Sequence, residues 1–392
     1  MSPKSLQDIV ARDAVVQGWA HLAPQDACGG GPLHGLTLGV KDVIDVAGMP
    51  TTHGSPIFRD NVATDDAKAV ALLRTAGAAI LGKTVTAEFA AYSPGPTVNP
   101  HAPARTPGGS SSGSAAVVAD GQADLALGTQ TAGSVIRPAS YCGVLGFKPS
   151  FGRYPLEGVL PTAPSLDTLG LFARALDPLI AADAVLSGET ALPPPATSLT
   201  VGLCQSPAWP VAEENMRQAL FDFAARLGDA GIAVVNIEPD EEVAALTEAQ
   251  KIIHRREAWV ALGDIRRRHP DLVSDVFRAF IDAGAAESES SYRDALQTQR
   301  DGVARSHALF ASVDLLLLPG APGVAPLGLG STGDPAFQRI WTALGVPCLG
   351  FPGAWTQDGL PLGLQMIGPR GQDRQLLSNA AAIVAHAPLR EV

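Results

Sequence analysis

The chain has 392 residues, 46% of them hydrophobic and 17% charged, which supplies a large core and is unlike the composition of a disordered chain. Its formal net charge of −11, from 28 basic and 39 acidic residues, argues against a basic surface for nucleic acid. Apolar runs such as 313–319 are far shorter than the ~20 residues of a membrane helix. The first eight residues lack the apolar core of a secretion signal, so we expect a cytoplasmic protein.

Cysteine and histidine spacing argues against metal and disulfide sites. The four cysteines, at positions 28, 142, 204 and 348, are isolated, and the histidines include no His-Glu-x-x-His motif. We therefore expect no metal and no cofactor. The one dense basic run, Arg266–His269, fits a solvated helix end better than a nucleic-acid site.

Strand-like and helical runs alternate from about residue 33 to 150, which predicts a sheet with helices on its faces. The expected strands are 36–40, 78–81 (closed by Gly82), 124–128 and 143–147, and the expected helices are 65–76 and one starting at 114–120.

The second half begins after a stiff proline-rich break at 192–196, the best candidate linker. Strands are expected at 199–204 and 233–237 around a helix at 211–230, then a run of helices at 240–312 in which Pro270 ends one. Strands return at 314–318, 348–351 and 362–367, before a closing helix at 373–386. This order predicts one α/β domain over residues 1–392, with a core at about 33–175, a helical excursion at about 205–312 and a return to one mixed sheet at about 313–392.

A glycine-rich loop, Gly128–Ser134, follows the strand-like run 125–127 and offers Ser134 as a nucleophile. Small residues at Ala132 and Gly133 would let a substrate carbonyl approach the main-chain N–H groups, which can stabilise an oxyanion. The alternative is a purely structural role, in which the segment is a glycine turn whose serine caps a helix.

A second loop, Gly108–Ser114, is also rich in serine and glycine. Its purely structural interpretation is a flexible connector. Its Gly-x-Ser-x-Gly pattern would make Ser111 the nucleophile of an α/β-hydrolase elbow. Such an elbow needs a preceding strand, and the proline-rich segment 99–107 cannot form one, so we disfavour that reading.

Lys41 ends an apolar run upstream of both loops. Alone it reads as a surface lysine. Buried at a strand end, it would have a lowered pKa and could act as a neutral base.

Together these segments resemble the amidase signature family of serine amidohydrolases. The resemblance covers most of the chain and rests on 39–42, the Gly-Gly-Ser-Ser loop, 128–134, 137–149, 165–170, 331–334, 345–347 and 359–365. It implies a Ser–cisSer–Lys triad: Ser134 is the nucleophile, Ser110 follows a cis peptide bond and relays a proton, and Lys41 is the base. It also implies an oxyanion hole from the N–H groups of Thr131, Ala132, Gly133 and Ser134, with Ser111 supporting the triad.

The pattern from Gln130 to Pro138 is most similar to the small malonamidase-type members. In those an arginine just after the nucleophile holds a substrate carboxylate, and Arg137 matches it; a structural arginine is the equal alternative. Gln130 and Arg137 are therefore the candidate substrate-binding residues. Two departures from the family pattern are Ala132, whose methyl group can restrict substrates, and Ser112, which replaces a common glycine.

These residues predict an enzyme that hydrolyses a small carboxamide to a carboxylate and ammonia or an amine through a serine acyl-enzyme. The expected partner is a small amide, with neither nucleic acid nor membrane, and a homodimer is one option for assembly. The alternatives are the A-type subunit of a glutamine-dependent tRNA amidotransferase and a non-catalytic amide-binding relic of the fold.

Overall fold

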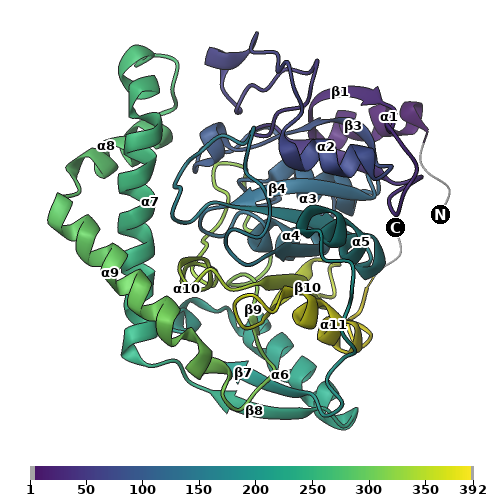
Figure 1. Cartoon of the computed structure of the whole chain (residues 1–392), viewed down its shortest axis with the longest axis vertical. Coiled ribbons are helices and arrows are strands. Elements are labelled where there is room, and N and C mark those ends of the chain that lie inside the picture. The colour runs from purple at the N-terminus through teal and green to yellow at the C-terminus, as the bar shows by residue number, and fades with distance from the viewer. Residues whose placement is uncertain (1–4, 390–392) are drawn as a thin grey trace.

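The computed structural model describes residues 5–389, which form one α/β domain around an eleven-stranded mixed sheet (Figure 1). The strand order is β1-β3-β2-β4-β6-β5-β10-β11-β9-β7-β8. Neighbours are parallel around β2 (β3 and β4) and around β7 (β8 and β9), and antiparallel elsewhere. The strands are β1 (Trp19–Gln25), β2 (Thr37–Lys41), β3 (Ala79–Thr84), β4 (Leu125–Gln130), β5 (Leu145–Lys148), β6 (Thr168–Ala173), β7 (Thr200–Cys204), β8 (Ala233–Ile237), β9 (Leu315–Pro319), β10 (Cys348–Trp355) and β11 (Pro361–Ile367).

Helices cover both faces of the sheet, because the central strands are apolar on both sides. The helices are α1 (Leu6–Val16), α2 (Lys68–Thr75), α3 (Ser112–Ala119), α4 (Ile136–Cys142), α5 (Leu176–Ser187), α6 (Glu214–Asp229), α7 (Glu241–Arg268), α8 (Asp275–Ala286), α9 (Glu289–Arg305), α10 (Arg339–Ala343) and α11 (Asp373–Val384). Short 3₁₀ helices span Pro56–Phe58, Glu88–Ala90, Trp209–Val211 and Ser306–Phe310.

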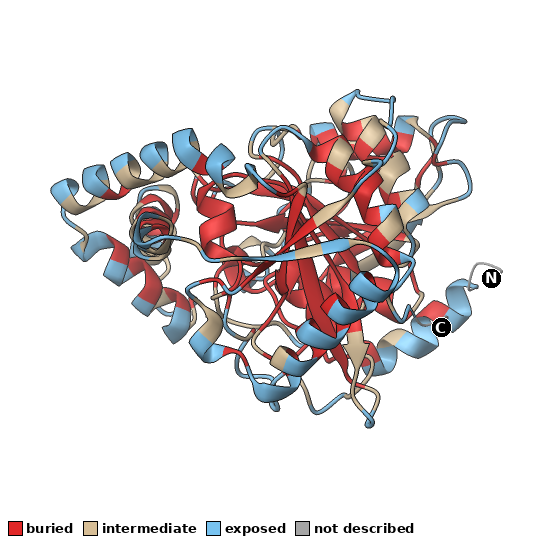
Figure 2. Ribbon diagram, turned by 90° about the horizontal axis from the view of Figure 1, so that it is seen from below, coloured by how far each residue is buried: buried red, intermediate tan, exposed pale blue. Residues whose placement is uncertain are grey.

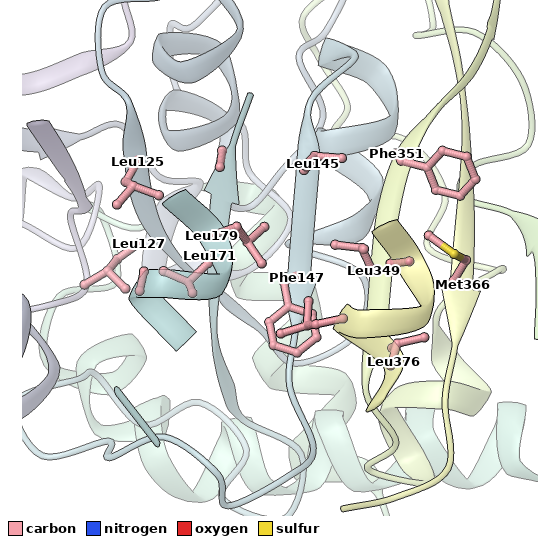
Figure 3. Close-up of a cluster of buried hydrophobic side chains, with 14 of the residues drawn as sticks. Leu125, Leu127, Leu145, Phe147, Leu171, Leu179, Leu349, Phe351, Met366 and Leu376 are labelled. Atoms are coloured by element: carbon pink, nitrogen blue, oxygen red, sulfur yellow. The ribbon is translucent and has the colours of Figure 1, made fainter. Parts of the chain in front are cut away.

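The two faces have different cores. Helices α2, α5, α6 and α11 pack on one face against large side chains, which Figure 3 shows directed to the same side of the sheet from Leu125, Leu127, Leu145, Phe147, Leu171, Leu349, Phe351 and Met366. Helices α3, α4 and α10 pack on the other face, where the hydrophobic residue that β4 contributes is Ala126. That small residue and the Ser-Gly-Ala-rich α3, buried along its whole length, let backbones approach closely.

Helices α7, α8 and α9 form a layer to one side of the sheet (green in Figure 1). The side chain of Asp240 caps α7 by accepting from Val243 N, and the helix ends just before Pro270, as expected. Their outer faces are exposed and the sheet is buried (Figure 2). Among residues 5–389 no helix is both long and apolar enough to cross a membrane.

Most expected elements are present, with shifted ends. The helix expected from Asp65 begins only at Lys68, because Asp66 instead accepts a hydrogen bond from Ala47 N and pairs with Arg74. Gly82 does not close β3: the strand continues to Thr84, and a Cβ at Gly82 would lie 2.2 Å from the His21 carbonyl oxygen of β1. Strands β1 and β6 were missed, and the proline-rich break runs along α11, where Ser378 donates to Pro193 O.

We expect the buried leucine side chains of β4 to contribute strongly to the free energy of unfolding. Leu127 is fully buried, so Leu127→Ala should lower the free energy of unfolding by about 2–5 kcal/mol in a denaturant titration, through lost burial and a residual cavity. The matched control is Leu327→Ala, at a leucine that is 73% exposed, which should change that free energy by less than about 0.5 kcal/mol. Equal effects of the two changes would contradict this account of the core.

Candidate active site

Three segments converge at one edge of the sheet. Strands β2 and β4 are parallel neighbours, with Val40 opposite Leu127, so their carboxyl ends lie side by side. Lys41 is the last residue of β2, and the loop 131–134 leaves the end of β4 and leads into α4. The loop before α3 brings Ser110 to the same place.

The Lys41 amine is completely buried and lies among hydroxyl groups. Its Nζ is 2.8 Å from Ser110 Oγ and 2.7 Å from Thr129 Oγ1. No carboxylate forms an ion pair with it within residues 5–389. Burial lowers the pKa of Lys41 well below its usual value, a shift that the charge of Asp167 opposes and that of Arg137 reinforces. The amine is therefore suited to accept a proton.

The loop before α3 has the backbone geometry that the resemblance implies. The Gly109–Ser110 peptide bond is cis. Ser111 Oγ donates to Thr129 O at 3.2 Å and accepts from Thr129 N at 3.3 Å, which joins this loop to β4. Gly128 makes room for that contact, because its Cβ would lie 2.8 Å from Ser111 Oγ. Ser111 is fully buried and follows no strand, so the elbow reading has no support.

The loop 131–134 is held by its carbonyl oxygens. The Thr131 oxygen accepts from Gln250 Nε2 at 2.9 Å, that of Ala132 from Thr342 Oγ1 at 2.7 Å, and that of Gly133 from Arg137 N at 3.0 Å. In the described chain none of the N–H groups of residues 131–134 donates to a protein acceptor. Ser134 is partly exposed, and its hydroxyl has no hydrogen bond within residues 5–389. Free donors thus surround a free hydroxyl.

Gln130 supports this loop from behind. Its Oε1 accepts from the N–H groups of Val135 and Ile136, at 2.9 and 3.1 Å, and its Nε2 donates to Thr342 Oγ1 at 3.0 Å. The side chain is fully buried, and both ends of its amide are used inside the protein. These contacts direct Gln130 to the loop and to α10, and its role in substrate binding stays a prediction.

Arg137 joins three segments. Its Nη2 donates to the Gly109 carbonyl at 2.6 Å, and Nε and Nη2 donate to the carbonyl and hydroxyl oxygens of Thr332, at 2.7 and 3.1 Å. Only Nη1 lacks a hydrogen bond within the described part of the chain. The side chain is 2% exposed, and burial lowers the pKa of its guanidinium. One of its three hydrogen bonds therefore holds the peptide that carries Ser110, and the other two hold Thr332.

Sequence reasoning assigned no role to Asp167, which contacts the loop 131–134 through Thr131. It accepts from Thr131 Oγ1 at 2.5 Å and from the N–H groups of Thr162 and Ala163, at 2.8 and 2.9 Å. Burial raises the pKa of Asp167 to about 6, although these hydrogen bonds oppose the shift. The segment that carries it contributed to the resemblance, which was the only available signal. Across residues 5–389 no three His, Cys, Asp or Glu side chains form a group that could hold a metal ion.

The sequence model of the family described as Amidase matches residues 19–377. The chain belongs to the amidase signature family. A curated relative, the A-type subunit of the glutamyl-tRNA(Gln) amidotransferase of Thermus thermophilus, is 34% identical over 90% of this chain and 84% of its own length. Among solved structures, an amidase has a TM-score of 0.87 at 31% identity, covering 97% of this chain and 95% of its own. The peptide amidase of Stenotrophomonas maltophilia has a TM-score of 0.81 at 25% identity, covering 98% and 93%. Members of the family act on amide C–N bonds, so the chain is an enzyme of this class.

For an amidase whose base is Lys41, the negative charge of Asp167 should set the acid limb of the pH profile. That charge raises the pKa of Lys41, so Asp167→Asn should lower it, and the neutral amine should persist to lower pH. We expect the acid limb of kcat/KM to move down by about one pH unit.

The control is Asp358→Asn, at an exposed turn, which should leave the acid limb of kcat/KM at the same pH. If Asp167→Asn lowers the rate but does not move the limb, Asp167 acts only through the position of Thr131.

Proposed function

We propose that the protein hydrolyses a small carboxamide through a serine acyl-enzyme, with Ser134 as nucleophile and Ser110 and Lys41 as proton carriers. The observation that carries the proposal is the 2.8 Å contact between the buried Lys41 amine and Ser110 Oγ, at the edge where Ser134 emerges. A hydroxyl becomes an effective nucleophile only when a base removes its proton. A non-catalytic relic would have no need to keep an amine buried without a carboxylate beside it.

In this mechanism Ser134 Oγ attacks the amide carbon while its proton passes to Ser110 and from Ser110 to Lys41. The N–H groups of residues 131–134 hold the oxyanion, and the leaving nitrogen takes the proton back. Water then attacks the acyl-enzyme and releases the acid.

A second candidate is the A-type subunit of a tRNA-dependent amidotransferase. It is favoured by curated relatives of that name, such as those of Thermus thermophilus and Natronomonas pharaonis, each 34% identical. That function requires glutamine as the ammonia donor and stable protein partners. Selective release of ammonia from glutamine and co-purification with a partner would favour it. Ammonia release from simple amides by the isolated chain would favour the hydrolase.

Ser134→Ala should abolish activity, because it removes the hydroxyl that attacks the amide carbon in the proposed mechanism. We expect turnover in an ammonia-release assay to fall by about 10⁴-fold or more, with loss of labelling by a fluorophosphonate. The assay should cover malonamate, biuret-like, aliphatic and aryl amides and glutamine. The control is Ser331→Ala, at an exposed serine, which should keep both turnover and labelling. Undiminished turnover in Ser134→Ala would refute the mechanism.

We further propose that Arg137 mainly positions the Gly109–Ser110 peptide. Arg137→Ala should therefore lower kcat/KM for acidic and neutral amides by a similar factor, about 10- to 100-fold, because Ser110 loses its support. The check is steady-state kinetics with a matched pair of amides, one of them carrying a carboxylate. A KM that rises for the acidic amide alone would instead assign Arg137 to the substrate carboxylate.

A further inference from the structure

Two residues that are distant in sequence hold the carbonyl oxygens of the loop 131–134. Gln250 comes from α7, in the helical layer, and Thr342 comes from α10, which packs against α7. Gln250 Nε2 donates to the Thr131 carbonyl at 2.9 Å, and Thr342 Oγ1 donates to the Ala132 carbonyl at 2.7 Å. All four residues are buried, so the loss of either hydrogen bond would leave a buried carbonyl oxygen without a partner.

The direction of the Gln250 hydrogen bond is fixed by a second partner. Arg339 Nη1 donates to Gln250 Oε1 at 2.6 Å. A guanidinium can only donate, so the oxygen of the Gln250 amide must face Arg339. The NH2 group of that amide then faces Thr131 as a donor. Gln250 cannot turn its amide over without losing both hydrogen bonds.

The direction of the Thr342 hydrogen bond is fixed in the same way. Gln130 Oε1 accepts from the N–H groups of Val135 and Ile136. The NH2 group of Gln130 therefore faces Thr342 Oγ1, to which it donates at 3.0 Å. Because the Thr342 hydroxyl accepts there, its single proton is left to donate to the Ala132 carbonyl. Each of the two supports is thus a donor aimed at one carbonyl of the loop.

These two carbonyls determine where the N–H groups of the same peptide planes point. The peptide bonds of the loop 131–134 are trans, so the carbonyl of one residue and the N–H of the next point in opposite directions. A fixed Thr131 carbonyl therefore sets the direction of the Ala132 N–H, and a fixed Ala132 carbonyl sets that of the Gly133 N–H. Neither Ala132 nor Gly133 has a polar side chain that could fix these planes instead.

We infer that Gln250 and Thr342 are positioning residues of the oxyanion hole. They keep the N–H groups of Ala132 and Gly133 directed at the place where the attacked carbonyl oxygen becomes negative. This inference rests on the proposed amidase function, and it adds two residues that act through the main chain rather than on the substrate. A donor of this kind is most effective when it is aimed at the developing charge before the reaction begins.

Thr342→Val removes the hydroxyl donor and keeps the shape of the side chain. It should lower kcat by about 10- to 100-fold and change KM by less than about threefold, because a misdirected donor costs less than the ~10²- to 10³-fold of a deleted one. Gln250→Met should have a similar effect through the other carbonyl. Thr342→Ser, which keeps the hydroxyl, should retain most of the wild-type kcat. The measurement is steady-state kinetics on the amide that the wild type hydrolyses fastest.

Labelling by a fluorophosphonate gives a second readout that needs no amide. Ser134 Oγ displaces fluoride in that reaction, and the phosphoryl oxygen gains negative charge as the bond to phosphorus forms. The labelling rate of Thr342→Val and of Gln250→Met should therefore fall by about the same factor as kcat. That of Thr342→Ser should stay close to wild type.

The matched control is Thr97→Val. Thr97 is also 2% exposed, and its hydroxyl donates to the Gln17 carbonyl at 2.8 Å. The control should lower the thermal midpoint, as the loss of a buried hydrogen bond does, and leave kcat and labelling at wild-type rates. Wild-type rates in Thr342→Val or Gln250→Met, or equal losses in the control, would overturn the inference. Turnover that disappears in Ser134→Ala supports the proposed function whatever Thr342 does, so the two can fail separately.

Discussion

The site depends on keeping the Lys41 amine buried without a carboxylate beside it. Two other lysines are equally buried, and each has hydrogen-bond partners of a different kind. Lys83 donates to Asp42 Oδ1 at 2.9 Å, while Lys148 donates to the carbonyl oxygens of Pro149 and Val346. Lys41 has hydroxyl partners, which stabilise its charged form less than a carboxylate does. It is therefore the one of the three whose surroundings suit a base that also relays protons through a hydroxyl.

The sequence neighbour of Lys41 shows how this is arranged. Asp42 follows Lys41 directly, and a free carboxylate there would raise the pKa of the amine. Successive side chains of an extended segment point to opposite sides, so Asp42 turns away from Lys41. There it accepts hydrogen bonds from Lys83 and from Thr52 N. The Lys83–Asp42 pair thus occupies the carboxylate that could otherwise compete for Lys41, and it also joins β3 to the end of β2.

The sequence predicts those parts of the site that local motifs form. It does not predict contacts between segments that lie far apart along the chain. The strands β2 and β4 follow from local patterns, and the approach of Lys41 to Ser110 follows from the resemblance. The supports of the loop 131–134 do not, because Gln250 lies 119 positions and Thr342 210 positions from the carbonyls that they hold. Neither stands in a motif. Gln130 and Arg137 were identified by position, but their partners, which decide whether they face the substrate or the scaffold, come from distant segments.

Strand β6 was missed for a related reason. It is buried on every residue, so it shows no alternation, and its Gly170 is a residue that usually weakens a strand. In the folded protein a Cβ at Gly170 would lie 2.7 Å from the Phe147 carbonyl oxygen, so the glycine allows β5 and β6 to pack closely. Asp167 directly precedes this strand, and the antiparallel pairing of Gln130 with Thr168 is what brings it beside Thr131. Because strand β6 was not predicted, the position of the Asp167 carboxylate beside Thr131 was not predicted either.

The charges around the site act on the base and on the oxyanion together. The positive charge of Arg137 lowers the pKa of Lys41, and the negative charge of Asp167 raises it. A positive field near the oxyanion loop also favours negative charge that develops on a bound carbonyl oxygen. In the proposed mechanism the same arginine charge would therefore favour the neutral form of Lys41 before attack and stabilise the oxyanion that attack produces. Asp167 acts in the opposite direction, but its own pKa of about 6 means that its charge weakens as the pH falls. The opposition to a neutral Lys41 is thus smallest at low pH, where the amine is most readily protonated.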